Sequence, residues 1–258
     1  MNYKKSKLKY KLKNGLTSIG SWLTIPSTEI IEIYSKSKFE WLVIDMEHTG
    51  ISISEAKELI KIIQANEMEA LVRVPKNEEV IIKKVLDLGA NGIIIPMINN
   101  KKDAEKAISF SKYPPDGVRG VGLNRAQGYG FDFEKYKKWH KDNLIIITQI
   151  EHKLAVENIE SILEVEGIDA TLIGPYDLSA SMGFPGKYNM PTIKKTLRKL
   201  EADISKSKIP LGLHLIEPSS KLLKEKINMG YNLIAFSIDF LFLGEKIRSE
   251  MKSIDNEG

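Results

Sequence analysis

The sequence contains no cysteine among its 258 residues. This absence excludes disulfides, thiolate metal sites and a cysteine nucleophile. No apolar run approaches the ~18 residues of a membrane-spanning helix, and the basic amino terminus is not followed by the apolar core of a secretory signal. We therefore expect a cytoplasmic protein that does not enter a membrane.

The sequence also lacks a strong excess of one charge. Lysine and arginine number 38 against 34 acidic residues, for a formal net charge of +4, which is too balanced to indicate nucleic-acid binding. Six lysines do crowd the first thirteen residues, and we expect residues 1–14 to form a solvated basic extension. Residues 15–258 then have the length of a single β/α barrel domain, which needs about 250 residues.

Short apolar runs alternate with amphipathic stretches eight times along the chain. The runs cover residues 18–25, 41–44, 70–74, 92–96, 144–150, 170–173, 210–215 and 233–238. Continuous apolar runs are typical of parallel strands buried on both faces, and the stretches between them have helical spacing. The pattern predicts an α/β fold, the (β/α)8 TIM barrel. A doubly wound open sheet is the alternative, but no Gly-x-Gly-x-x-Gly follows an early strand.

Residues 113–130 interrupt this alternation. The segment is rich in glycine, lacks periodicity and contains Arg119 and Arg125. Long irregular segments inside compact domains are usually functional or disordered, and the two arginines favour function here. Ordinary turn chemistry is the alternative explanation for the glycines.

Charged and polar residues stand at the carboxyl ends of the predicted strands, where β/α barrels form their active sites. They are Asp45, Glu47 and His48 after strand two, Arg73 after strand three, Gln149 and Glu151 at strand five, Asp177 after strand six and His214 in strand seven. We expect them to converge at one end of the barrel.

Glu151 and Asp177 belong to neighbouring predicted strands, so their carboxylates can meet. Two carboxylates completed by water suit Mg²⁺ or Mn²⁺, whereas calcium needs more protein oxygens and zinc prefers nitrogen or sulfur. A glycosidase-type acid/base pair is the alternative, but no aromatic sugar platform lies nearby. Backbone N–H groups of the turn 174–177 could hold an anion such as a substrate carboxylate.

His48 follows two carboxylates closely, and a carboxylate on one ring nitrogen makes the other a better base. Arg73 is suited to stabilising an enolate or alkoxide, which is compatible with a buried salt bridge to Asp45 or Glu47. A metal, an arginine and a histidine together suit proton abstraction beside a carbonyl. The predicted strands contain no lysine, which argues against a Schiff-base aldolase.

Eight short blocks follow one another between roughly residues 15 and 248. They are Ile44-Asp45-Met46-Glu47-His48, Val72-Arg73-Val74-Pro75, Leu86-Asp87-Leu88-Gly89-Ala90, Ile95-Pro96-Met97, Tyr113-Pro114-Pro115, Arg119-Gly120-Val121-Gly122, Gln149-Ile150-Glu151 and Gly174-Pro175-Tyr176-Asp177-Leu178-Ser179. In this order they resemble the HpcH/HpaI-type class II pyruvate aldolases, also called 2-oxo-3-deoxy acid aldolases.

The resemblance implies reversible cleavage of a 4-hydroxy-2-oxo acid, or a 2-oxo-3-deoxy sugar acid, to pyruvate and an aldehyde through a metal-stabilised enolate. It implies a divalent metal (Mg²⁺ or Mn²⁺, with Co²⁺ as a further candidate) and no organic cofactor. The alternatives are an oxaloacetate-type decarboxylase or CoA-thioester lyase of the same superfamily, and a non-catalytic barrel that binds an oxo acid.

The resemblance also implies roles for the residues that bind metal and pyruvate. Glu151 and Asp177 would ligate the metal, Gln149 would support them, and the backbone around Gly174 and Tyr176 would bind the pyruvate carboxylate.

For the reacting atoms, the resemblance implies that Arg73 holds the enolate oxygen. His48, paired with Asp45, would act through a water as acid and base on the aldol hydroxyl. Glu47 would be supporting structure, and His214 is a further candidate.

Family members form hexamers, as trimers of dimers that exchange the eighth helix, and a neighbouring subunit completes each site. Asp87 and the loop with Arg119, Asn124 and Arg125 are candidates for that interface. Residues 124–130 differ from the Ser- and Ala-rich loop of the homoprotocatechuate-pathway members, so the aldehyde partner does not carry over.

Overall fold

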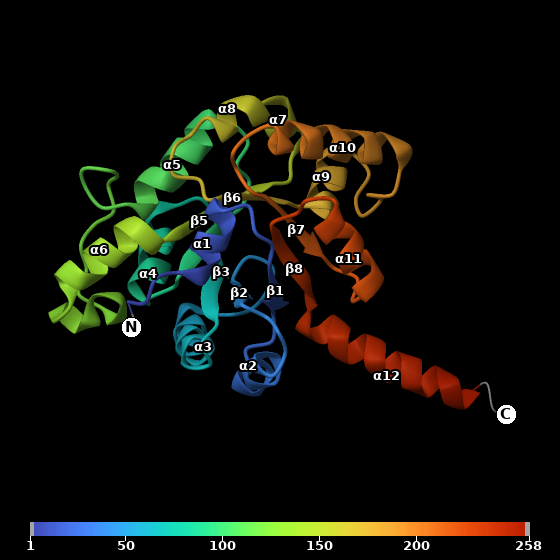
Figure 1. Cartoon of the computed structure of the whole chain (residues 1–258), viewed down its shortest axis with the longest axis horizontal. Helices are drawn as coiled ribbons and strands as arrows, with labels where there is room; N and C mark the ends of the chain where they lie inside the picture. Colours follow the sequence, from blue (N-terminus) through green and yellow to red (C-terminus); the bar gives the residue numbers. More distant parts are fainter. Residues whose placement is uncertain (1–2, 256–258) are drawn as a thin grey trace.

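The computed structural model describes residues 3–255, and its eight parallel strands close into a barrel (Figure 1). The strands are β1 (Ser18–Leu23), β2 (Trp41–Asp45), β3 (Glu69–Arg73), β4 (Gly92–Ile95), β5 (Ile145–Ile150), β6 (Ala170–Ile173), β7 (Leu211–Leu215) and β8 (Leu233–Ile238). Each strand pairs with the next in the sequence, and β8 pairs with β1. The predicted (β/α)8 barrel is confirmed.

Helices surround the barrel. They are α1 (Lys7–Lys13), α2 (Thr28–Ser35), α3 (Ile53–Ala65), α4 (Glu79–Asp87), α5 (Lys101–Ser111), α6 (Phe133–Asn143), α7 (Lys153–Glu157), α8 (Ile159–Leu163), α9 (Pro175–Ser181), α10 (Pro191–Ser205), α11 (Ser220–Asn228) and α12 (Asp239–Asp255), with the 3₁₀ helix η1 (Arg125–Gly130). None of the helices within residues 3–255 combines the length and hydrophobicity that a bilayer span requires.

Apolar side chains fill two layers on either side of the strands. In β2, Val43 belongs to the cluster inside the barrel, whereas Leu42 and Ile44 belong to the cluster between the strands and the helices. Burial on both faces explains why the strand sequences are continuous apolar runs.

Helix α1 packs against the amino-terminal end of the barrel. Leu8 and Leu12 are only 1% and 3% exposed and join the cluster inside the barrel with first residues of strands, such as Trp41 and Ile145. Lys9 lies 3.1 Å from Asp169 in a buried ion pair. The expectation of a solvated amino terminus is therefore wrong for this helix, and the domain boundary at residue 14 stays a prediction.

Two segments differ from the alternation seen in the sequence, and side-chain hydrogen bonds account for both. The stretch between β5 and β6, which has helical spacing in the sequence, is divided into α7 and α8 at Asn158, whose side chain donates to Asn99 O at 3.0 Å. Within residues 113–130, Asn124 and Gln127 form a capping box that begins η1.

Helix α12 projects away from the barrel (Figure 1). Its apolar side chains between 48% and 64% exposed are Phe240, Leu243, Ile247, Met251 and Ile254. This spacing of three or four residues places them on one face of the helix.

Candidate active site

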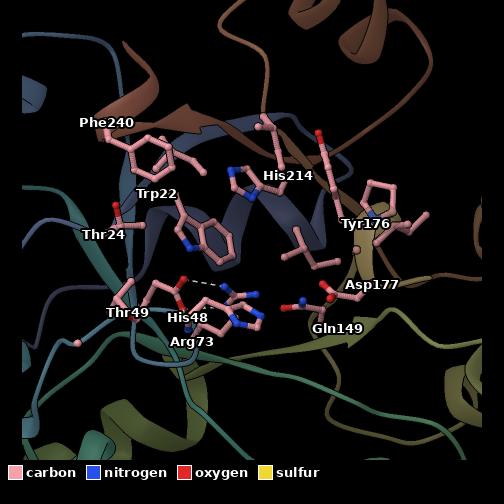
Figure 2. Close-up of a pocket in the computed structure, with 18 residues that line it drawn as sticks. Trp22, Thr24, His48, Thr49, Arg73, Gln149, Tyr176, Asp177, His214 and Phe240 are labelled. Carbon is pink, nitrogen blue, oxygen red and sulfur yellow. Dashed lines mark hydrogen bonds and ion pairs between the residues drawn. The ribbon is translucent and has the colours of Figure 1, made fainter. Parts of the chain in front are cut away.

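A cavity of about 630 Å³ opens at the carboxyl ends of the strands (Figure 2). The predicted residues that line it are Asp45, His48, Arg73, Gln149, Gly174, Tyr176, Asp177 and His214. The structure thus brings together residues that are far apart in the chain, and their roles stay predictions.

Asp45 and Arg73 form a buried, two-bond ion pair in the cavity wall. They are the last residues of β2 and β3 and stand opposite each other in the strand register. Arg73 Nε donates to Asp45 Oδ1 at 2.9 Å and Nη2 donates to Oδ2 at 2.6 Å. Burial raises the pKa of Asp45, but the hydrogen bonds and charge of Arg73 outweigh it, so the net pKa is lowered. Asp45 is therefore a fixed anion that orients Arg73.

His48 does not have the partner that the sequence suggested. Asp45 Oδ1 accepts from the backbone N–H of His48 at 3.4 Å, and the His48 ring instead lies 3.9 Å from Glu47 Oε2. The predicted pairing of Asp45 with the His48 ring is thus wrong, because Arg73 occupies the carboxylate. The His48 side chain is 60% exposed and lines the cavity.

Glu151 is buried behind the cavity wall. Its Oε1 accepts from Met97 N at 2.8 Å, and its Oε2 accepts from Gln149 Nε2. Burial, together with the negative charges of Glu47 and Asp177, outweighs the hydrogen bonds from Met97 and Gln149 and raises the pKa of Glu151 to about 7. The three carboxylates are thus close enough to repel one another.

This surplus of acidic oxygens fits a divalent cation. Gln149 Oε1 and Glu47 Oε2 are buried and accept no hydrogen bond among the described residues, although Arg73 Nη1 lies 3.2 Å from the Glu47 oxygen. Among residues 3–255, no three His, Asp or Glu side chains are grouped so that they could hold a metal ion by themselves. Oxygen donors of this kind suit Mg²⁺ or Mn²⁺.

Gly174 leaves the space that Glu151 occupies. A Cβ added to Gly174 would lie 2.9 Å from Glu151 Cβ and 3.1 Å from its Oε2. Asp177 follows in the first turn of α9, where the leading N–H groups have no partner within the helix. The cavity therefore combines carboxylates with free backbone donors.

Trp22 and Thr24 were missed by the sequence reasoning, although both line the cavity. The Trp22 ring stacks on His214 with centroids 4.5 Å apart, and the Arg73 guanidinium lies 4.9 Å from the Trp22 ring centroid (Figure 2). Because Trp22 stands in an apolar run, the sequence alone assigns it to the hydrophobic core. Its position near the carboxyl end of β1 could have marked it as a candidate active-site residue.

His214 is held in the neutral form. Its Nε2 lies 3.2 Å from the Ser237 carbonyl oxygen, which can only accept, so this nitrogen carries the hydrogen. Burial, together with the positive charge of Arg73, outweighs the hydrogen bond to Ser237 and lowers the pKa of His214 to about 4. His214 therefore supports the Trp22 ring without adding charge to the cavity.

The interface candidates Asp87, Arg119, Asn124 and Arg125 do not line this cavity. The buried Arg119 donates to Asp87 Oδ1 at 2.7 Å and to Tyr136 at 2.9 Å. Arg125 donates to Leu88 O at 2.9 Å. These bonds fix residues 113–130 against α4 and α6, and a role for this loop at a subunit interface stays a prediction.

Known proteins share this fold and sequence over nearly the whole chain. The sequence model of the family described as HpcH/HpaI aldolase/citrate lyase matches residues 18–239. A 2-keto-3-deoxy-L-rhamnonate aldolase of Salmonella gallinarum is 32% identical over 242 residues, which are 93% of this chain and 90% of that protein.

Solved structures agree with the sequence comparison. An HpcH/HpaI aldolase/citrate lyase family protein of Burkholderia cenocepacia superposes with a TM-score of 0.90 at 27% identity, covering 96% of this chain and 98% of that one. An HpcH/HpaI aldolase of Desulfitobacterium hafniense gives a TM-score of 0.87 at 27% identity, with 96% of each chain covered.

Proposed function

This chain belongs to the HpcH/HpaI aldolase/citrate lyase family, and from that membership we propose that it cleaves a 2-oxo-3-deoxy sugar acid. It is a class II pyruvate aldolase, a carbon–carbon lyase. The proposed products are pyruvate and a hydroxylated aldehyde, and the reaction is reversible. The substrate class is that of the 32% identical relative, which is named for 2-keto-3-deoxy-L-rhamnonate. The observation that carries the proposal is the single cavity onto which His48, Arg73, Gln149 and Asp177 all open.

Glu151 and Asp177 would hold a divalent ion, Mg²⁺, Mn²⁺ or Co²⁺. The support is the buried Gln149 Oε1 without a partner and the raised pKa of Glu151, since both would be relieved by a cation. Such an ion supplies Lewis-acid polarisation of the 2-oxo group. Gln149 would keep Glu151 in place through the hydrogen bond to its Oε2.

Arg73 would bind the oxygen of the 2-oxo group. Asp45 fixes two of its nitrogens, so the remaining face of the guanidinium is preorganised for an oxyanion. Backbone N–H groups at Tyr176 and Asp177, in the first turn of α9, would bind the substrate carboxylate. The substrate is then held at both ends of its oxo-acid group.

His48 would take the proton of the substrate's 4-hydroxyl group, directly or through a water. The bond between C3 and C4 then breaks, the aldehyde leaves, and the electron pair stays on the pyruvate fragment as an enolate. Protonation at C3 completes pyruvate. Glu47, 3.9 Å from the His48 ring, would stabilise the imidazolium that forms.

The assembly that we propose is a hexamer, a trimer of dimers that exchange α12. The exposed apolar face of α12 supports it, as do exposed apolar residues of the loop, namely Val118, Val121, Leu123 and Phe131. Asp87 and the loop with Asn124 and Arg125 would then border a neighbour's cavity. We also propose a cytoplasmic location, where the enzyme would bind the small-molecule oxo acid and aldehyde.

Exchange of the pyruvate methyl protons in D2O tests the enolate directly and needs no knowledge of the aldehyde. We expect exchange to require Mg²⁺ or Mn²⁺, to stop with EDTA and to return when metal is restored. Cleavage of a 2-oxo-3-deoxy sugar acid should show the same metal requirement, and should exceed turnover of oxaloacetate or malyl-CoA measured in parallel. Methyl exchange that is absent with every metal would contradict the proposed function.

A further inference from the structure

A second cavity of about 450 Å³ lies at the opposite end of the barrel from the active-site cavity. It is bordered by α1, α6, the residue after α5 and the segments that lead into β5 and β6. Five lysines line it, namely Lys9, Lys13, Lys112, Lys137 and Lys141. The aldolase reaction proposed above uses none of them.

The acidic residues of this cavity do not balance its lysines. Only Asp116 and Asp169 line it, and Asp169 is already engaged. Its Oδ1 lies 3.1 Å from Lys9 Nζ, and its Oδ2 accepts from Ile146 N at 2.9 Å. Lys9 and Asp169 therefore form an internal pair, which leaves one exposed aspartate against four lysines.

Three of these four lysines have no carboxylate partner within residues 3–255. No acidic oxygen lies within the 4.0 Å ion-pair distance of Lys13, Lys112 or Lys141, and the partner of Lys137 is Glu134 at 4.0 Å, with both side chains largely exposed. The positive charge of the cavity is thus available to a ligand.

Gly167 leaves room in the cavity wall for the ammonium group of Lys112. Gly167 has a φ of +100°, and a Cβ added to it would lie 2.6 Å from Lys112 Nζ. The missing side chain therefore makes room for the ammonium group beside the backbone.

His140 lies in the cavity wall close to several cationic side chains. The ring is buried, and its Nε2 donates to Ser111 O at 2.8 Å. Burial, together with the positive charges of Arg119, Lys9 and Lys112, outweighs the hydrogen bond to Ser111 and lowers the pKa of His140 to about 3. His140 therefore contributes a neutral imidazole to the cavity wall, and the charges around it are positive.

We infer that this cavity binds a compact multivalent oxyanion, such as phosphate, pyrophosphate or the phosphate group of a metabolite. Its volume lies in the range of small-ligand pockets, ~300–1,000 Å³. Lysine ammonium groups are point charges that form strong hydrogen bonds to phosphate oxygens. The site is independent of the proposed function. It lies at the opposite ends of β5 and β6 from Glu151 and Asp177.

Isothermal titration of the full-length protein with pyrophosphate tests this site, in EDTA and at an ionic strength matched with NaCl. We expect saturable binding that is at least about tenfold weaker in a Lys112→Gln/Lys141→Gln variant, because two uncompensated charges are lost. A Lys194→Gln/Lys195→Gln variant removes the same charge from the exposed surface of α10, and its dissociation constant should stay within about twofold of the wild-type value.

Two further variants keep the test independent of folding. Lys112→Arg/Lys141→Arg retains the charges and should keep most of the affinity, whereas the exposed Lys13→Gln should weaken binding by about threefold. Wild-type protein without saturable binding would overturn the inference. Equal weakening in the cavity and α10 variants would also overturn it, since the effect would then be that of net charge alone.

Discussion

Arg73 is the residue on which the geometry of the site depends. Its guanidinium bonds twice to Asp45, lies 3.2 Å from Glu47 and faces the Trp22 ring at 4.9 Å. These contacts with two carboxylates and an aromatic ring hold the guanidinium group in one orientation. An ammonium group could carry the same charge but could not reproduce the two-bond fork.

Arg73→Lys should therefore slow aldol cleavage and pyruvate methyl exchange together. Both reactions pass through an enolate, and a misplaced cation stabilises it less. We expect losses of about 10²-fold in both rates, in the range for removal of one oxyanion donor. NMR of methyl exchange and a coupled assay of pyruvate release measure the two rates.

His48→Ala in the same assays should separate the two reactions. Cleavage should fall by ~10²–10⁴-fold, as for loss of a general base, while methyl exchange should stay within about threefold. His152→Ala removes a histidine whose ring caps α7, and both rates should change little. If His48→Ala slowed exchange as much as cleavage, its role at the 4-hydroxyl group would be wrong.

The sequence located the polar residues of the site and offered a salt bridge from Arg73 to Asp45 or Glu47, which the structure shows, but it also paired Asp45 with the His48 ring. Carboxyl ends of strands can be read from apolar runs, which is why Asp45, Arg73 and Gln149 were identified. Partners depend on strand register. Asp45 is three residues from His48 but stands opposite Arg73 in the sheet, and only the folded barrel shows that Arg73 occupies its carboxylate.

At the scale of elements, the strands could be predicted because both of their faces are buried, which gives continuous apolar runs in the sequence. Helix α1 was not, because its buried face is only Leu8 and Leu12 in a segment otherwise rich in lysine. Two apolar residues four apart do not establish a period. The division of α7 from α8 could not be predicted from the sequence either, because it depends on a hydrogen bond from Asn158 to the distant Asn99.

Leu8→Ala should destabilise the whole barrel, because α1 covers its interior cluster. We expect a loss of about 2–4 kcal/mol in the free energy of unfolding, the usual cost of a buried leucine truncation. Tyr10→Ala, on the exposed side of the same helix, should cost less than about 0.5 kcal/mol. Urea denaturation followed by circular dichroism compares them. Equal stability of both variants would show instead that residues 1–14 are a dispensable extension.

At the scale of the whole molecule, α12 is the helix that does not cover the closed barrel along its length. Most helices pack an apolar face on the strands, but α12 leaves the barrel (Figure 1) with its apolar face uncovered. Exposed apolar faces of this extent indicate a protein interface. Since the helix follows β8 directly, a neighbouring barrel that receives it would also lie close to the cavity mouth, where Phe240 lines the wall.

Leu243→Glu/Ile247→Glu should therefore break the assembly. Charges on this face cannot be buried without partners, so the subunits should separate even if each barrel stays folded. Light scattering after size exclusion should give the wild type six times the 29.1 kDa of one chain, and the variant a smaller mass. Ser249→Glu/Ser253→Glu places the same charges on the opposite face of α12 and should leave the mass unchanged. A wild-type mass of one chain would contradict the exchange of α12, and an unchanged mass in the first variant would show that this face is not the interface.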